Sequence, residues 1–96
     1  MSTLKETLEL VEDEILKATI KFPTWPSDPL HALAVLGEEY GELTKAVLQL
    51  VYEPHKTTFE DAHEEAIQTA AMAIRWLMSF EHYDFKRGKQ HSQGEV

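Results

Sequence analysis

The sequence predicts an all-α protein, an antiparallel helical bundle with three main helices that is completed by oligomerisation. Apolar residues recur at helical spacing along three long segments, and no stretch shows the alternation of apolar and polar residues that is typical of strands. Proline-containing stretches separate the three segments and interrupt the helices. A chain of 96 residues corresponds to one domain that buries only about 60–65% of its unfolded surface, so partner subunits would add stability.

The first helix is predicted to begin beside Thr3. Thr3 and Glu6 match a capping box, in which each side chain accepts a hydrogen bond from the backbone of the other residue. Apolar residues then form one narrow stripe, Leu4, Leu8, Val11, Ile15 and Ala18. The segment KFPTWPSDP, residues 21–29, contains three prolines and is expected to be an ordered loop with an aromatic pair.

The second helix is predicted for residues 30–52. Asp28 and Pro29 are a typical N-cap and first-turn residue, and the segment EPHK after Tyr52 interrupts the helix. The apolar residues cover an arc wider than a contact with one helix needs, so we expect burial against more than one neighbour. These residues are Leu33, Leu36, Tyr40, Leu43, Val47, Leu50 and Val51.

The third helix is predicted to continue to about Phe80. Its cap is Thr57 or Thr58, each of which is followed three residues later by an acid, Glu60 or Asp61. The connection EPHKTT is short, which makes the second and third helices antiparallel neighbours.

The composition excludes several classes of protein. The chain has 17 acidic and 9 basic side chains and a formal net charge of -8, which argues against nucleic acid as a partner. Without cysteine there is no disulfide, thiolate metal site or cysteine nucleophile. The first residues are too acidic for a signal or transit peptide, and no apolar run reaches the roughly 18 residues that a membrane span needs. We expect a cytoplasmic protein with one helical domain over residues 1–85 and a flexible tail over residues 86–96.

The second and third predicted helices, which are otherwise rich in apolar residues, each carry a row of acidic side chains. At about 100° per residue, three carboxylates of the second helix share an arc of roughly a quarter-turn: Glu38, Glu39 and Glu42. A second row surrounds Gln68 on the third helix: Asp61, Glu64 and Glu65. If the two helices are antiparallel neighbours, the rows can face one another near mid-length.

Facing rows of carboxylates predict a cation site. Like charges a few ångströms apart cost several kcal/mol unless they are neutralised, and a divalent cation does this directly. The candidate ligands are all oxygens, which favours Mg²⁺ or Mn²⁺ over zinc. The alternative is that these glutamates are ordinary solvated surface charge.

The segment from Leu33 to Leu77 resembles the all-α NTP pyrophosphohydrolase superfamily, the MazG-like and dimeric dUTPase-like enzymes. Those enzymes carry E-E-x-x-E on one helix and E-x-x-D on the next, and this chain has EEYGE at residues 38–42 and EAIQ at residues 65–68. The resemblance implies Mg²⁺-dependent cleavage of a (d)NTP between the α and β phosphates, to a nucleoside monophosphate and pyrophosphate. It also implies a homodimer or homotetramer.

The resemblance implies roles for the acidic residues. Glu39 and Glu42 would ligate Mg²⁺ together with Glu65 of the facing helix. Gln68 stands where the family has aspartate, so it would offer an amide oxygen without a charge. Glu38 would orient or deprotonate the attacking water.

Four further residues are candidates for substrate contacts. Trp25, in the loop that the resemblance places beside the pocket, is a candidate to stack on a nucleobase or, alternatively, to plug the end of the bundle. His31 shares the face of Glu42 and is a candidate contact for a base or phosphate, or a capping-turn residue. Lys45 and Arg75 point along the acidic faces, as phosphate ligands or as salt-bridge partners.

Two other functions stay open at this point. One is a degenerate member of the superfamily, in which Gln68 has removed catalysis and left nucleotide or metal binding. The other is a helical oligomerisation or adaptor module whose acids are only solvated.

Overall fold

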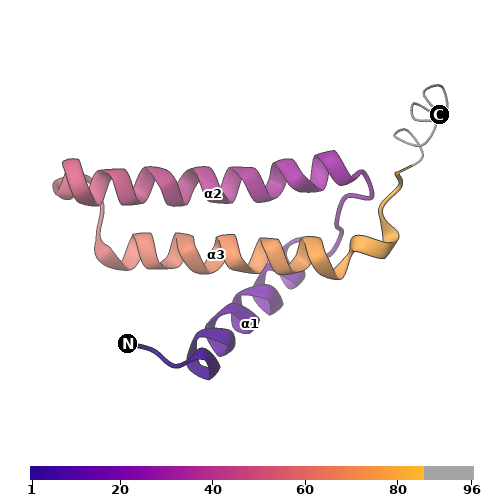
Figure 1. The fold of residues 1–96 in the computed structure, drawn as a ribbon, viewed down its shortest axis with the longest axis horizontal. Helices are drawn as coiled ribbons and strands as arrows, with labels where there is room; N and C mark the ends of the chain where they lie inside the picture. The colour runs from indigo at the N-terminus through magenta and orange to yellow at the C-terminus, as the bar shows by residue number, and fades with distance from the viewer. Residues whose placement is uncertain (86–96) are drawn as a thin grey trace, which may run out of the picture.

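The computed structural model describes residues 1–85, and that part of the chain is helical without strands (Figure 1). The predicted all-α class is therefore confirmed. The elements are α1 (Leu4–Lys21), α2 (Pro29–Tyr52), the 3₁₀ helix η1 (Pro54–Lys56), α3 (Phe59–Met78) and the 3₁₀ helix η2 (Phe80–His82). No helix in this range is long and apolar enough to cross a membrane. The tail predicted for residues 86–96 lies outside the described residues.

The predicted helix caps are confirmed. Thr3 and Glu6 form the reciprocal box, in which Glu6 N donates to Thr3 Oγ1 at 3.1 Å and Thr3 N donates to Glu6 Oε1 at 2.9 Å. Asp28 caps α2 by accepting a hydrogen bond from the backbone two residues later, at 2.9 Å. Of the two threonines considered for α3, Thr58 is the cap, and its Oγ1 accepts from Asp61 N at 3.0 Å.

The α2 and α3 helices run side by side, whereas α1 crosses α3 obliquely and diverges from α2 (Figure 1). The only completely enclosed side chains among the described residues are alanines, Ala32 of α2 and Ala71 of α3. Ala46 and Ala62 are also buried. Small side chains allow two helix backbones to approach closely, so we attribute the α2–α3 contact mainly to alanine packing.

The core lies where α1 crosses α3. Its buried members are Val11, Ala18, Ala71 and Met72. At the C-terminal end of α3 the ring centroids of Trp76 and Tyr83 are 5.0 Å apart, and those of Trp76 and Phe80 are 5.5 Å apart. The helix ends at Met78 rather than at Phe80, because the chain tightens there into η2.

Much of the apolar side of α2 stays uncovered within the single chain. Leu33 is 49% exposed, Tyr40 63% and Val51 64%. The expected burial against more than one neighbour is not met in the described residues, because α3 is the only long helix packed against α2 and α1 packs on α3. One helix covers only a narrow strip of another, so the rest of the α2 apolar arc faces outward.

Candidate functional site

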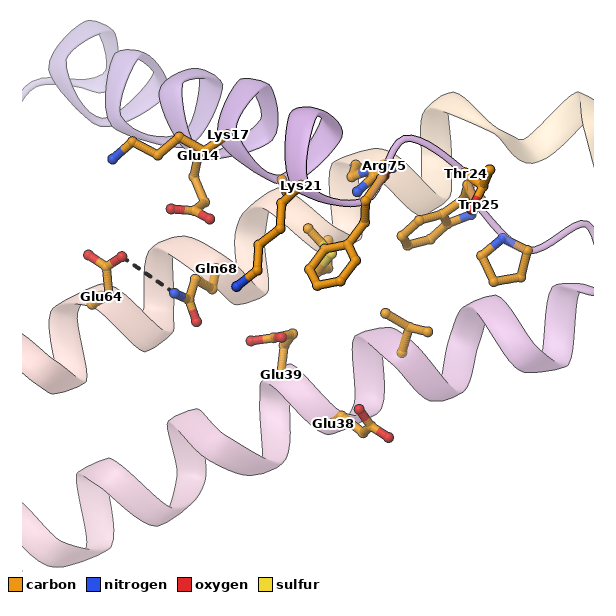
Figure 2. Close-up of a pocket in the computed structure, with 15 residues that line it drawn as sticks. Glu14, Lys17, Lys21, Thr24, Trp25, Glu38, Glu39, Glu64, Gln68 and Arg75 are labelled. Carbon is orange, nitrogen blue, oxygen red and sulfur yellow. Dashed lines mark hydrogen bonds between the residues drawn. The ribbon is translucent and has the colours of Figure 1, made fainter.

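A cavity of about 750 Å³ opens between α1 and α2, with α3 as its floor (Figure 2). It forms because α1 and α2 both approach α3 but diverge from one another. The loop between α1 and α2 closes one end. The charged and polar side chains along the three helices are Glu14, Lys17, Lys21, Glu38, Glu39, Glu64, Gln68 and Arg75. Pockets of this volume accept drug-sized ligands.

Glu39 and Glu65, predicted from two different helices, both lie beside the contact between α2 and α3. Thr69 Oγ1 lies 3.1 Å from the backbone oxygen of Glu39 and 2.8 Å from that of Glu65, so one hydroxyl links the two helices at this level. Glu65 Oε2 is shielded from solvent and has no hydrogen-bond partner. A shielded carboxylate oxygen without a donor is a group that a bound cation would stabilise.

Carboxylates of the acidic rows on α2 and α3 lie close enough for their charges to interact across the contact between the two helices. Burial raises the pKa of Glu39, and negative charge on four other glutamates raises it further: Glu65, Glu38, Glu42 and Glu14. Burial also raises the pKa of Glu65, followed by the charges of Glu42, Glu64 and Asp61. Burial and the neighbouring charges thus both disfavour the ionised carboxylates, and a cation between them would offset both effects.

The donor chemistry suits a hard divalent ion. The group of Glu39, Glu42 and Glu65 offers only oxygens, one of them shielded and without a donor, which fits Mg²⁺ or Mn²⁺. Within residues 1–85, no three His, Asp or Glu side chains stand close enough together to enclose an ion in their present positions. The structure therefore brings acids of both rows into one electrostatic group without forming a closed ligand set.

Gln68 and Glu64 form a pair on the cavity floor. Gln68 Nε2 donates a hydrogen bond to Glu64 Oε1 at 3.4 Å, and both side chains line the cavity (Figure 2). Asp61, one turn before Glu64, is not part of the cavity wall. Glu64 therefore supplies a carboxylate beside the neutral amide of Gln68.

Trp25 lies at the closed end of the cavity and is held from two sides. Its Nε1 donates to Tyr83 Oη at 2.7 Å, and the guanidinium carbon of Arg75 lies 4.7 Å from its ring centroid. Arg75 is buried and donates from Nη2 to the backbone oxygen of Phe22 at 3.1 Å. The arginine thus fixes the loop that carries Trp25.

The other two predicted substrate contacts lie outside this cavity. His31 is exposed in the first turn of α2, and Lys45 is exposed near the middle of the same helix. Neither residue is among those that line the cavity of the described chain. Glu42 is likewise exposed and absent from the lining, although its charge acts on both Glu39 and Glu65.

Three side chains of α1 belong to the cavity but were not predicted as site residues: Glu14, Lys17 and Lys21. They recur three and four residues apart and flank the buried Ala18. That spacing shows that they share a helix face. Their role depends on the direction in which α1 leaves α3, which helical spacing does not specify.

Comparison with protein-family models, curated proteins and solved structures found no match for this chain. The fold and the cavity define a small all-α protein with carboxylates on α2 and α3, basic side chains on α1 and an aromatic ring at one end. These features suit a ligand that combines a flat ring with an anionic, metal-chelating group.

Proposed function

We propose that the protein is a Mg²⁺-dependent nucleoside triphosphate pyrophosphohydrolase, which cleaves (d)NTPs between the α and β phosphates to a nucleoside monophosphate and pyrophosphate. The observation that carries the proposal is that Glu39 and Glu65 lie beside the same contact between α2 and α3, where the charge of Glu65 acts on Glu39. These residues stand in the EEYGE and EAIQ segments that resemble the motifs of MazG-like enzymes. The adjoining cavity adds an aromatic ring and basic groups.

The proposed metal ligands are Glu39, Glu42 and Glu65, with the amide oxygen of Gln68 in the place of the family aspartate. Bound Mg²⁺ or Mn²⁺ would neutralise phosphate oxygens and align them for displacement. The protein contributes a group of carboxylates whose burial and mutual repulsion, the causes of the raised pKa values of Glu39 and Glu65, favour cation binding.

The proposed general base is Glu38. It follows Gly37 on α2 and lines the cavity beside Glu39. In this role the carboxylate accepts a proton from the water that attacks the phosphate chain, while the bond between the α and β phosphates breaks and pyrophosphate departs. A carboxylate is suited to this step because its oxygens can accept a hydrogen bond from water.

The proposed base-binding residue is Trp25, at the closed end of the cavity. Stacking needs a ring whose orientation is fixed, and the contacts of Trp25 with Tyr83 and Arg75 supply this. Arg75 acts here by holding the loop. His31 and Lys45 would contact a ligand only where it extends beyond the cavity.

We also propose that the active form is a homodimer or homotetramer. The outward side of α2 exposes several large apolar side chains, namely Leu33, Tyr40, Val47, Leu48 and Val51. A second copy of this face would bury them, and contiguous exposed apolar surface is a mark of protein interfaces. Light scattering coupled to size exclusion should give two or four times the monomer mass. A monomer at micromolar concentration would refute this part of the proposal.

The decisive experiment is a screen of the purified protein against canonical and modified (d)NTPs with Mg²⁺ or Mn²⁺. Pyrophosphate is the expected product, and orthophosphate without pyrophosphate would contradict the proposed bond cleavage. Glu39→Gln should abolish the release of pyrophosphate. The matched control is Glu12→Gln, which removes one charge from an exposed position on α1 and should leave activity unchanged.

A second candidate function is nucleotide binding without turnover. The observation in its favour is Gln68, whose neutral amide bonds to Glu64 where the family has a charged ligand. This candidate predicts that the wild-type protein binds a Mg²⁺–dNTP complex but releases no pyrophosphate, and that Gln68→Asp creates activity. If neither Glu39→Gln nor Gln68→Asp changes Mg²⁺ binding, both site-based functions fail and the adaptor module is favoured.

A further inference from the structure

The cavity is lined by lysine side chains that form no ion pair with the glutamates lining the same cavity. Lys17 and Lys21 line the same cavity as four glutamates, Glu14, Glu38, Glu39 and Glu64. Nevertheless, the only ion pair within 4.0 Å among residues 1–85 joins Lys56 and Glu53, at 2.7 Å, and neither residue lines the cavity. The lysines that α1 brings to the cavity, its basic wall, therefore form no ion pair with the carboxylates that α2 and α3 bring to it, its acidic wall.

Lys21 is the lysine directed into the cavity. Figure 2 shows its side chain extending from the last turn of α1 toward Glu39 and Gln68, whereas the amino group of Lys17 points away from them. The Lys21 Nζ atom also lies 5.4 Å from the ring centroid of Phe22, which restricts its position. An ammonium group on this wall can donate three hydrogen bonds to an anion between the walls.

The order of groups along the cavity matches a nucleotide. Trp25 lies at the closed end, Glu14, Lys17 and Glu64 lie at the other end, and Lys21 lies between them (Figure 2). A ligand with its base at Trp25 would extend its phosphate chain past Lys21, with the carboxylates of α2 and α3 on the other side. A metal-chelated triphosphate can be held from both sides, because the ion suits the acidic wall and the phosphate oxygens suit the basic wall.

We propose that Lys21 binds a phosphate oxygen of the triphosphate, which makes α1 a phosphate-binding wall across the cavity from the carboxylates. This inference rests on the proposed function, since it requires a nucleotide held at Glu39 and Glu65. The competing explanation is that Lys21 only stabilises the C-terminus of α1, where a positive charge is favourable. The two explanations differ in what a substitution does to ligand binding.

The test compares Lys21→Gln with Lys5→Gln, its matched control. Lys5 is an exposed lysine of the first turn of α1 and lines a different, apolar groove, so its substitution removes the same charge from the same helix. The probe is a nucleoside triphosphate with a methylene bridge between the α and β phosphorus atoms, titrated with Mg²⁺ in a calorimeter. Mg²⁺ alone is titrated in parallel, and thermal unfolding checks that each variant folds.

Loss of one charged phosphate contact should weaken analogue binding by about tenfold and raise KM to a similar extent. The kcat value and the affinity for Mg²⁺ alone should change by less than about threefold, and Lys21→Arg should recover most of the loss. Lys5→Gln should behave like the wild type.

If Lys21→Gln binds the analogue as tightly as Lys5→Gln does, the inference is wrong and Lys21 serves only the helix. The proposed function would then survive, provided that Glu39→Gln still abolishes pyrophosphate release. If the wild-type protein binds neither Mg²⁺ nor the analogue, the proposed function fails first and this inference with it.

Discussion

The acidic segments of α1 and α2 resemble one another in sequence but not in surroundings. Residues 9–14 read ELVEDE and residues 37–42 read GEEYGE. On α1, Glu12 and Asp13 are exposed, whereas on α2 Glu39 is half-buried and faces Glu65 of α3. Glu14 is the exception on α1, because it lines the cavity and its charge raises the pKa of Glu39. The burial and the electrostatic surroundings of a glutamate therefore depend on the groups that pack near it in the fold rather than on its neighbours in the sequence.

Removing one carboxylate from the acids at the α2–α3 contact, and one from the exposed acids of α1, should give the largest contrast. Glu65→Gln removes a proposed metal ligand from the group facing Glu39, and the release of pyrophosphate should fall by about 100-fold or more. Asp13→Asn, the control on α1, should leave the rate unchanged. A steady-state pyrophosphate assay makes the comparison, and equal rates for both variants would show that the facing acids have no special role.

Adding a carboxylate at the candidate site should raise the affinity for Mg²⁺, whereas adding one elsewhere on α3 should not. Gln68→Asp adds a fourth formal charge to the proposed ligands Glu39, Glu42 and Glu65, so the affinity for Mg²⁺ should rise by about tenfold. His63→Asp, which introduces an acid at an exposed position of α3, should have little effect. Calorimetric titration with Mg²⁺ distinguishes the two. An equal gain in both variants would indicate a general effect of net charge.

The threonine hydroxyl that links α2 and α3 should contribute more to the free energy of unfolding than a threonine hydroxyl bonded within one helix. Thr69 Oγ1 contacts backbone oxygens of both helices, whereas Thr44 Oγ1 donates only to Tyr40 O of its own helix, at 2.9 Å. Thr69→Val should lower the free energy of unfolding by about 1 kcal/mol more than Thr44→Val. Urea unfolding measures both, and equal losses would mean that the contact between the helices contributes nothing.

The smallest expected effect is a pH-dependent change in the stability of the metal-free protein. The pKa of Glu39 is raised in the folded state, so the folded protein binds more protons than the unfolded chain as the carboxyl titrates. Stability falls as the pH rises from the ordinary glutamate range through this raised pKa. Glu39→Gln should therefore stabilise the metal-free protein at neutral pH and not near about pH 4, by less than about 0.5 kcal/mol because solvent screens the charges.

Thermal unfolding at both pH values, with and without Mg²⁺, measures this last effect. Saturating Mg²⁺ should reverse the order at neutral pH, since the wild type then gains binding energy that the variant lacks. A variant that is less stable than the wild type at neutral pH without metal would show that Glu39 is not destabilised by its neighbours.

Features set by local interactions were predictable from the sequence. The capping pair Thr3 and Glu6 and the cap Asp28 lie within three residues of the groups that they bind, so a short pattern identifies them. The acidic rows follow from helical geometry, and the short connection between α2 and α3 brings them together. The two acidic rows were thus accessible from spacing, whereas the roles proposed for their members came from the resemblance to a known superfamily.

Other features depended on how distant segments pack. The divergence of α1 from α2 brings Lys21 and Glu14 to the cavity, and Arg75 turns inward to bond Phe22 and cover Trp25. The outward apolar side of α2 also follows from this arrangement, because α3 alone packs against it. Periodicity shows which residues share a helix face. Which neighbour that face contacts depends on how all of the helices pack together. The sequence by itself determined the three helices and the acidic rows, while only the tertiary structure decided what those rows face.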